Sequence, residues 1–221
     1  MKFLVVIPAY NEMPHIEDFL KILKKFDYDI LFVDDGSGDG TYEKIKEYGF
    51  RVIKHEKNMG KGAAIQTGAR YAIENDYDAI ITMDSDGQHD PALVPQFVKG
   101  LSGADIVLGS RRDYMNLENM PLDRYLVNRI TSTIISLLAG RLIEDPQNGY
   151  RGLNVEIFRR IRFIRNRFDF ETEILIKALR YGFRLTHVKV PVVYGVEKSH
   201  INKFKDTLRA IGLYLQFLFA S

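Results

Sequence analysis

The sequence contains no cysteine, and this absence removes several kinds of chemistry at once. The chain can form no disulfide framework, no thiolate metal site and no cysteine nucleophile, which is compatible with a reducing compartment. It also lacks a long hydrophobic run. The first apolar run, residues 3–7, ends at Pro8 without the length or the small-residue cleavage site of a signal peptide, so we expect a first β-strand there. The last run, residues 211–220, has about half of the roughly 20 residues that a spanning helix needs.

Charge of each sign is unevenly distributed along the chain. Residues 1–150 hold 17 Lys/Arg and 23 Asp/Glu, whereas residues 151–221 hold 14 and 6, although the net charge of the whole chain is only +2. An acidic portion can hold a metal ion, and a basic portion can meet phosphates or an anionic membrane surface. Many arginines between residues 159 and 167 also fit a solvated helix face. The length and the absence of a linker-like composition predict one α/β domain over residues 1–221.

Short β-branched runs alternate with amphipathic stretches in the first half of the chain. The pattern predicts strands at 3–7, 30–33, 51–55, 79–83 and 105–108, and helices at 16–26, 42–48, 63–74 and 92–101. Such alternation is typical of a mostly parallel sheet with helices on both faces, in which ligands bind at the carboxyl ends of the strands. The second half is less regular: a mobile loop is expected at 113–122, helices at 123–139, 155–161 and 171–181, and an extended piece at 185–194.

Two acidic residues follow the apolar run at 79–83, at the point where a buried strand should end. Asp84 and Asp86 can reach one cation only if the chain turns between them, and Gly87 permits that turn. Magnesium is commonly held by one or two carboxylates together with substrate phosphates. We therefore interpret the segment from Asp84 to Gln88, called the acid loop below, as part of a metal-assisted phosphate site. An ordinary acidic turn is the alternative when the motif is taken alone.

Six motifs together resemble the inverting GT-A-fold glycosyltransferases, in particular the dolichyl-phosphate mannose synthase and polyprenyl-phosphate glycosyltransferase branch. The resemblance extends from Val6 to about Lys205. Besides the acid loop, its parts are Pro8-Ala9-Tyr10-Asn11-Glu12, Val33-Asp34-Asp35-Gly36-Ser37 with Asp39-Gly40-Thr41, Asn58-Met59-Gly60-Lys61-Gly62, Gly109-Ser110-Arg111 and Asp145-Pro146-Gln147-Asn148-Gly149-Tyr150-Arg151. By this resemblance residues 1–110 form a nucleotide-sugar-binding half, 111–198 an acceptor half, and 199–221 a basic and apolar tail.

The resemblance also implies roles for the residues on the nucleotide side. Pro8, Tyr10 and Glu12 would hold the base and ribose, and Asp35 would contact one of them. A tyrosine ring can cover a base, and a carboxylate can accept from ribose hydroxyls. Lys61 is counted with this nucleotide site. Its glycine-flanked segment is not a P-loop, because no Ser or Thr follows the lysine; we expect it to bring a helix N-terminus close to the nucleotide.

On the phosphate side, the family resemblance makes Asp86 the direct ligand of magnesium or manganese, with Asp84 and Gln88 completing the shell. The ion would neutralise charge on the departing nucleoside diphosphate. Arginines after the acid pair bind phosphates in the family. The residues that match these positions are Arg111, Arg124 with Asn128, and Arg151. Lys198 matches the basic element that closes over the diphosphate. Asn128 replaces the family's serine, and the order of Lys198 and Ser199 is inverted, so these two matches are loose.

The acceptor decides whether a catalytic base is needed. A sugar hydroxyl must lose its proton to a positioned group, whereas a lipid phosphate is mostly ionised at neutral pH. Asp145 stands where a hydroxyl-activating acid would be expected. We predict transfer of a hexose to dolichyl or polyprenyl phosphate. A transferase that extends a glycan with Asp145 as its base, and a catalytically silent nucleotide-sugar-binding subunit, remain alternatives.

The same resemblance implies partners and a location. Expected partners are a nucleotide sugar, dolichyl or polyprenyl phosphate and a membrane surface, with no nucleic acid; a membrane subunit or a homo-oligomer is a further possibility in this family. The chain is expected in the cytoplasm, bound peripherally at the cytoplasmic face of the membrane. The apolar run at 211–220 follows several basic residues, so it would either anchor the chain there or pack on protein.

Overall fold

A computed structural model of the chain describes residues 1–111, 113, 122–191 and 217. Its elements, in chain order, are β1 (Phe3–Ala9), α1 (Ile16–Leu23), β2 (Ile30–Asp34), α2 (Thr41–Glu47), β3 (Arg51–Lys54), α3 (Lys61–Glu74), β4 (Ala79–Thr82), the short 3₁₀ helix η1 (Pro91–Leu93), α4 (Val94–Leu101), β5 (Ile106–Ser110), α5 (Leu122–Ala139), β6 (Arg151–Asn154), α6 (Glu156–Arg160), α7 (Phe170–Arg180) and β7 (Leu185–Lys189). The predicted α/β class with a mostly parallel sheet is confirmed.

The strands form one seven-stranded sheet in the order β3-β2-β1-β4-β6-β5-β7. All neighbouring strands are parallel except β6, which runs antiparallel to both β4 and β5. The sequence analysis predicted no strand at β6. This strand is four residues long and contains Arg151 and Gly152, so it carries neither the β-branched enrichment nor the alternation that identifies a strand.

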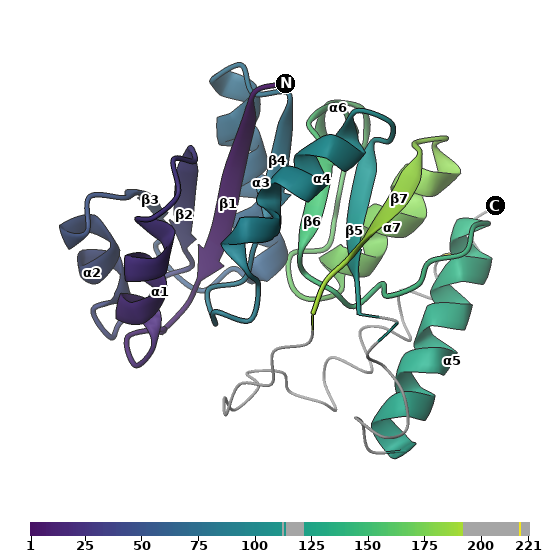
Figure 1. Cartoon of the computed structure of the whole chain (residues 1–221), viewed down its shortest axis with the longest axis horizontal. Coiled ribbons are helices and arrows are strands. Elements are labelled where there is room, and N and C mark those ends of the chain that lie inside the picture. The colour runs from purple at the N-terminus through teal and green to yellow at the C-terminus, as the bar shows by residue number, and fades with distance from the viewer. Residues whose placement is uncertain (112, 114–121, 192–216, 218–221) are drawn as a thin grey trace.

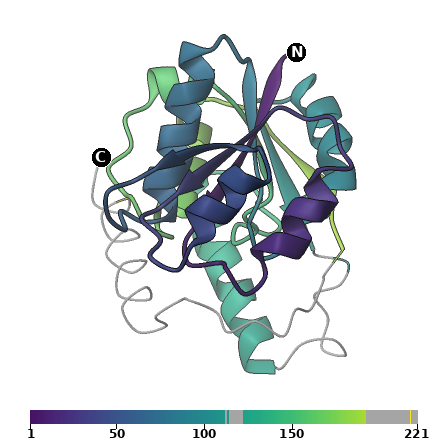
Figure 2. The same ribbon diagram turned by 90° about the vertical axis from the view of Figure 1, so that its left-hand side faces the viewer.

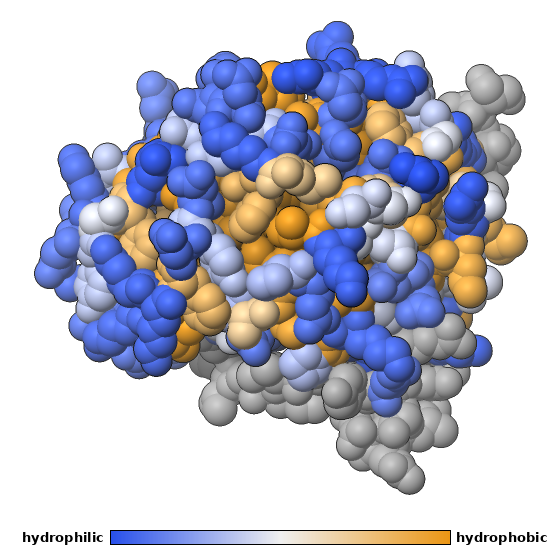
Figure 3. Space-filling view, turned by 45° about the horizontal axis from the view of Figure 1, so that its top comes forward, coloured by the Kyte–Doolittle hydropathy of each residue, from blue (hydrophilic) through white to orange (hydrophobic). Residues whose placement is uncertain are grey.

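Helices cover both faces of the sheet (Figure 1, Figure 2). Alternation along β1 explains this arrangement, because Leu4 and Val6 belong to a core with α3, α5, α6 and α7, whereas Val5 and Ile7 belong to a second core with α1, α2 and α4. Hydrophilic residues dominate the face of the molecule shown in Figure 3, with apolar residues between them over its middle. Burial of both sheet faces accounts for the continuous apolar runs of the central strands.

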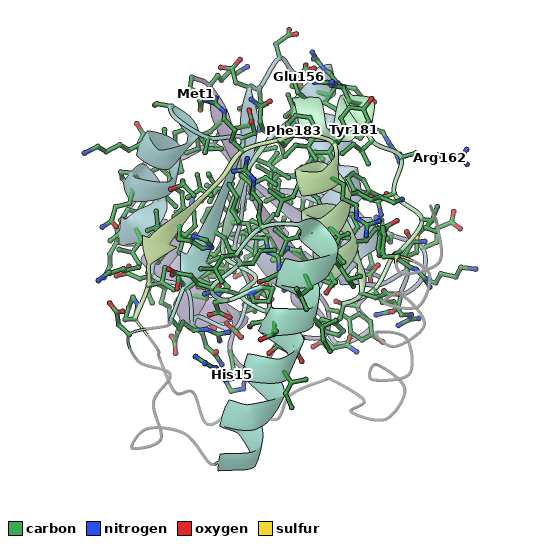
Figure 4. All side chains as sticks on the ribbon, turned by 90° about the vertical axis from the view of Figure 1, so that its right-hand side faces the viewer. Met1, His15, Glu156, Arg162, Tyr181 and Phe183 are labelled. Carbon is green, nitrogen blue, oxygen red and sulfur yellow. The ribbon has the colours of Figure 1, made fainter. Side chains whose placement is uncertain are left out.

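The closest packing of helix on sheet occurs at Gly68 in α3. A Cβ atom at this position would lie 2.3 Å from a methyl carbon of Val6 in β1, so no larger residue fits without movement. This contact brings α3 directly onto the sheet, and it places the start of α3 beside the carboxyl ends of the strands. The carboxyl ends of the parallel strands lie at the lower edge of the sheet in Figure 1. Figure 4 shows His15 at that edge and Met1, Glu156, Tyr181 and Phe183 at the opposite one.

One residue of the apolar run at 211–220 is described. Phe217 is buried in the same core as α5 and α7, its ring lies 5.3 Å from the guanidinium of Arg180, and its carbonyl accepts a 3.1 Å hydrogen bond from Nη2 of that arginine. This contact favours packing on the protein over a free membrane anchor at this position. Among the described residues, no helix has the length and apolar character needed to cross a membrane. The predicted loop at 113–122 and most of the tail lie outside the described residues.

Candidate active site

Loops from β1, β2 and β4 meet at the carboxyl edge of the sheet, where ligands bind in parallel α/β folds. Side-chain hydrogen bonds join them: Asn11 N donates to Ser37 Oγ at 2.9 Å, and Ser85 Oγ donates to Glu12 Oε1 at 3.1 Å. The structure therefore brings together three motifs that are separated by up to 73 residues in the chain. Tyr10 is exposed at this edge, and Pro8 lies in β1 opposite Val33 of β2.

Asp35 has a different environment from the one that the sequence suggested. Its carboxylate is 3 % exposed, accepts from Met59 N at 2.9 Å and from Gly60 N at 2.7 Å, and lies 2.7 Å from Nδ1 of His55. Both oxygens thus hold the segment that leads into α3. A base or ribose contact by Asp35 stays a prediction. Sequence reasoning gave no role to the preceding residue, Asp34, whose buried Oδ1 atom has no hydrogen-bond partner.

The acid loop follows the buried strand β4, as predicted. Gly87 has a φ of +74°, so the chain turns there in a conformation that favours glycine. Asp86 is half-buried, and its Oδ1 atom accepts a 2.9 Å hydrogen bond from the backbone N–H of Gln88. The turn therefore holds the Asp86 carboxylate at the edge of the sheet, within reach of solvent.

Asp84 is already paired with a cation of the protein itself. Lys61, the first residue of α3, places Nζ 2.6 Å from Asp84 Oδ1 and 3.0 Å from Glu171 Oε1 of α7. Burial lowers the pKa of Lys61, but the two carboxylates outweigh it and hold the pKa above its ordinary value. Burial likewise raises the pKa of Asp84, and Lys61 outweighs it, leaving a pKa of about 2. Lys61 and Asp84 are therefore both charged at neutral pH.

Gly149 closes over this cluster from the other side. A Cβ atom at Gly149 would lie 2.7 Å from both Asp84 Oδ2 and Lys61 Nζ, so only glycine allows the backbone to approach so closely. The Gly149 carbonyl is held in place by a 2.7 Å hydrogen bond from Thr82 Oγ1, at the end of β4. The Asp145–Arg151 motif and the acid loop are thus parts of one site.

His89 is a further residue of the site, and sequence reasoning assigned it no role. Its Nδ1 atom accepts a 3.0 Å hydrogen bond from the backbone N–H of Asp84, which requires that this nitrogen carry no proton. Its ring stacks on Tyr150 with centroids 4.9 Å apart, and Tyr150 stacks in turn on Phe97 at 4.1 Å. Burial lowers the pKa of His89. The sequence signal that could have identified it is its position directly after Gln88.

A small pocket beside the acid loop is lined by Gln88, His89, Arg111, Asn148, Tyr150 and Val190, among others. One of these lining residues, Arg111, is bonded to Asp145 of the 145–149 turn. Arg111 donates from Nε to Asp145 Oδ2 at 2.7 Å and from Nη2 to Oδ1 at 3.0 Å, and its backbone N–H contacts Oδ2 at 3.2 Å. Both oxygens of the buried Asp145 carboxylate are thus engaged by one arginine.

Arg151 lies behind the pocket and is 2 % exposed. Its guanidinium donates to three backbone carbonyls, those of Asn148 at 2.8 Å, Pro146 at 2.8 Å and Glu171 at 2.6 Å. It therefore joins the 145–149 turn to the start of α7. Burial lowers the pKa of this guanidinium. The structure places Arg151 as a support of the turn, whereas the sequence analysis expected it among the phosphate-binding groups.

Two other predicted phosphate ligands cannot be located in the same way. Arg124 falls in α5, but its side chain lies outside the described residues, as does Lys198 with its whole segment. Asn128 is half-buried on α5. Within the described part of the chain, no three acidic or histidine side chains gather into a complete metal site. Among the described residues, the acid loop contributes two acids, Asp84 and Asp86, to such a site.

Comparison with known proteins identifies the family to which the chain belongs. Residues 4–162 match the profile of glycosyl transferase family 2. The chain is 31% identical over 213 residues to a UDP-N-acetylglucosamine–dolichyl-phosphate N-acetylglucosaminyltransferase of Methanococcus voltae, covering 86% of this chain and 85% of that protein. It is 33% identical over 233 residues to a dolichol-phosphate mannosyltransferase of Pyrococcus furiosus, covering 99% of this chain but only 63% of that one.

Among solved structures, the fold is similar to glucosyl-3-phosphoglycerate synthase from Mycobacterium tuberculosis in complex with Mn²⁺, uridine diphosphate and phosphoglyceric acid. The TM-score is 0.74 at 21% identity, with 99% of this chain and 78% of that chain covered. At this identity the likeness shows the fold alone, and it agrees with the strand order described above. The chain belongs to glycosyl transferase family 2 and is a glycosyltransferase of the GT-A fold.

Proposed function

We propose that this glycosyltransferase moves a hexose, mannose or glucose, from a GDP- or UDP-linked nucleotide sugar to dolichyl or polyprenyl phosphate, with inversion at the anomeric carbon. The names of the relatives from Methanococcus voltae and Pyrococcus furiosus support a lipid-phosphate acceptor. The site supports it as well, because the acid loop, the small pocket and the 145–149 turn adjoin one another at the carboxyl edge of the sheet.

The observation that carries the choice of acceptor is the pairing of Asp145 with Arg111. A hydroxyl acceptor needs a base within hydrogen-bonding reach of its proton. Asp145 is the carboxylate that the sequence places for this task, but both of its oxygens are engaged by the Arg111 side chain and backbone. A phosphate with a second pKa near 6 is mostly dianionic at neutral pH and needs no such base. The geometry therefore supports a phosphate acceptor that arrives ionised.

A divalent cation, magnesium or manganese, fits the acid loop. Carboxylate oxygens are the donors that such ions prefer, and Asp86 with Gln88 is half-exposed at the edge of the sheet. When bound, the ion would offset negative charge on the departing nucleoside diphosphate. The Mn²⁺ and uridine diphosphate named with the mycobacterial synthase are consistent with this proposal. Two carboxylates suit an ion that receives its remaining ligands from substrate phosphates.

The protein's own groups would bind and orient the two substrates. The exposed ring of Tyr10 can cover a base, and Glu12, positioned by Ser85 Oγ and by a 2.8 Å bond from its own N–H to Thr41 Oγ1, can accept from a ribose hydroxyl. Arg111, 31% exposed in its side chain, lies at the pocket and can meet a phosphate. Arg151 would act through the turn that it supports.

We also propose that the protein works at the cytoplasmic face of a membrane, bound peripherally. The support is the acceptor: a polyprenyl chain is confined to lipid, so its phosphate reaches a protein only at the membrane surface. The balance of 14 Lys/Arg against 6 Asp/Glu in residues 151–221 fits an anionic surface. Vesicle flotation at low and high salt tests this part separately from the chemistry.

A transfer assay tests the function directly. Purified protein is incubated with radiolabelled GDP-mannose, UDP-glucose or UDP-N-acetylglucosamine, with dolichyl or undecaprenyl phosphate in detergent, and with Mn²⁺ or Mg²⁺. We expect label to enter the organic phase as a lipid-linked monosaccharide, and excess chelator to stop it. The Asp86→Asn variant serves as the inactive control.

The alternatives predict different outcomes in the same assay. Transfer to a glycan hydroxyl, together with loss of all turnover in Asp145→Asn, would replace the lipid-phosphate acceptor by the glycan-extending alternative. Binding of nucleotide sugar without hydrolysis or transfer to any acceptor would favour the silent subunit.

A further inference from the structure

Lys61 stands out because it was expected at the nucleotide and is instead placed among carboxylates. Its ammonium lies 2.6 Å from Asp84 and 3.0 Å from Glu171, and only 16% of its side chain is exposed. One cation thus faces two acids that come from different elements, the acid loop after β4 and helix α7. The three charges leave this cluster with a net charge of −1, and not the −2 that the two carboxylates alone would give.

The cluster also leaves little of Asp84 for another ligand. Its Oδ1 atom is held by Lys61 Nζ, and its Oδ2 atom lies against the backbone of Gly149, where a Cβ would come within 2.7 Å. The Asp84 backbone is held as well, through the bond from its N–H to His89. Asp86 lies two residues further along the acid loop, where its Oδ1 atom accepts the hydrogen bond from the backbone N–H of Gln88.

We propose that Lys61 is a resident counterion that keeps the acid loop a weak site for a free divalent cation, so that the cation binds together with the nucleotide diphosphate and not before it. The proposal rests on the proposed cation requirement and deepens it. A positive charge this close to Asp84 repels an incoming ion and occupies the oxygen that the ion would need. The negative charge of a diphosphate then supplies the missing attraction.

The proposal has a reciprocal consequence for binding. If nucleotide diphosphate raises the affinity for Mn²⁺ by some factor, Mn²⁺ must raise the affinity for the nucleotide by the same factor. Removal of the Lys61 charge should weaken this coupling, because the free protein would already bind the ion. Lys61 would then be a positioning residue that sets the order of binding and does not itself contact the substrate.

The test measures Mn²⁺ binding at equilibrium by electron paramagnetic resonance of the free ion, without nucleotide and then with GDP or UDP. In Lys61→Met we expect tighter Mn²⁺ binding without nucleotide, by on the order of tenfold or more, and a smaller enhancement by the nucleotide. Adding Asp84→Asn to this variant should remove the gain. Lys57→Met removes an exposed lysine from the preceding segment and is the matched control, with no change expected.

A double variant protects the test against misfolding. Lys61→Met leaves two buried carboxylates without a counterion, so Lys61→Met/Glu171→Gln removes one of those charges and should still bind Mn²⁺ more tightly than the wild type. Unchanged or weaker Mn²⁺ binding in both the single and the double variant would overturn the proposal. Because the measurement uses neither sugar nor acceptor, its outcome is independent of whether the proposed lipid-phosphate transfer is correct.

Discussion

Two regions of the site pair carboxylates with basic side chains in different proportions. In the first, the acids Asp84 and Glu171 share Lys61. In the second, Arg111 engages both oxygens of the single acid Asp145. Acidic charge is in excess in the first region, while in the second the charges balance and the arginine retains 31% exposure. The first region is suited to attract a cation, and the second to meet an anion.

The comparison shows that an acid in a motif cannot be assigned a role without its counterion. Asp84 and Asp145 both lie in motifs that the sequence linked to chemistry, yet each is already held by a basic side chain. Asp86 lies half-exposed in the same acid loop as Asp84. Variants that alter one region at a time test this contrast.

The largest effect is expected at Asp86. Asp86→Ala should reduce transfer by about a thousandfold or more and remove metal-enhanced nucleotide binding, because it deletes the proposed cation ligand. Its thermal stability should stay close to that of the wild type, since the side chain is half-exposed in a turn. Transfer rates with and without chelator measure the effect, with the exposed Asp18→Asn as control. Full activity of Asp86→Ala would refute the assignment of a cation to the acid loop.

Arg151→Met should show the next largest effect, and on stability first. The change leaves three buried carbonyl groups without their donor, which should cost about 3 kcal/mol or more of unfolding free energy. Denaturant titration measures it. Arg159→Met removes an exposed arginine with an i,i+3 partner and should change stability by no more than about 0.5 kcal/mol. A stable Arg151→Met protein that had lost only phosphate affinity would restore the original expectation for Arg151.

Arg111→Ala should reduce transfer by on the order of a hundredfold, the scale of one preorganised electrostatic contact. Arg111→Lys keeps the charge but loses the two-pronged contact with Asp145, so we expect an intermediate rate. Steady-state kinetics at varied lipid-phosphate concentration should show most of the loss in kcat/KM for the acceptor. Equal rates for the wild type and Arg111→Ala would mean that the balanced pair serves only to hold the 145–149 turn.

The smallest effect is expected for Asp145→Asn, less than about tenfold in transfer, because a dianionic acceptor needs no base. The pH profile should keep its shape. A variant with no turnover and a displaced profile would reverse the assignment, making the second region a base site in place of an anion site.

Much of the fold was predictable because the elements of the first half are strongly patterned. The runs at β1, β2 and β4 are predominantly apolar and lie between turn residues, and their carboxyl ends carry the polar motifs. Strand β6 was missed because its pairing depends on long-range contacts with Thr82 and Leu108, which no local pattern encodes. The sequence predicted which residues belong to the site, but not which of them contact one another. Asp35 is bonded by the backbone of Met59 and Gly60, and Asp84 is paired with Lys61, and only the folded chain brings these distant segments together.

The position of β6 in the sheet affects how the protein folds during synthesis. Strand β5 has no contact with β4 in the sheet, and the two are joined only through β6, which is made about 40 residues after β5 ends. During synthesis, β4 therefore presents an open edge with an apolar face until residues 151–154 arrive. A fragment that ends at residue 110 would keep that edge unpaired and should aggregate. Residues 1–110 should therefore not fold independently, because β6, which is made after them, is inserted between β4 and β5.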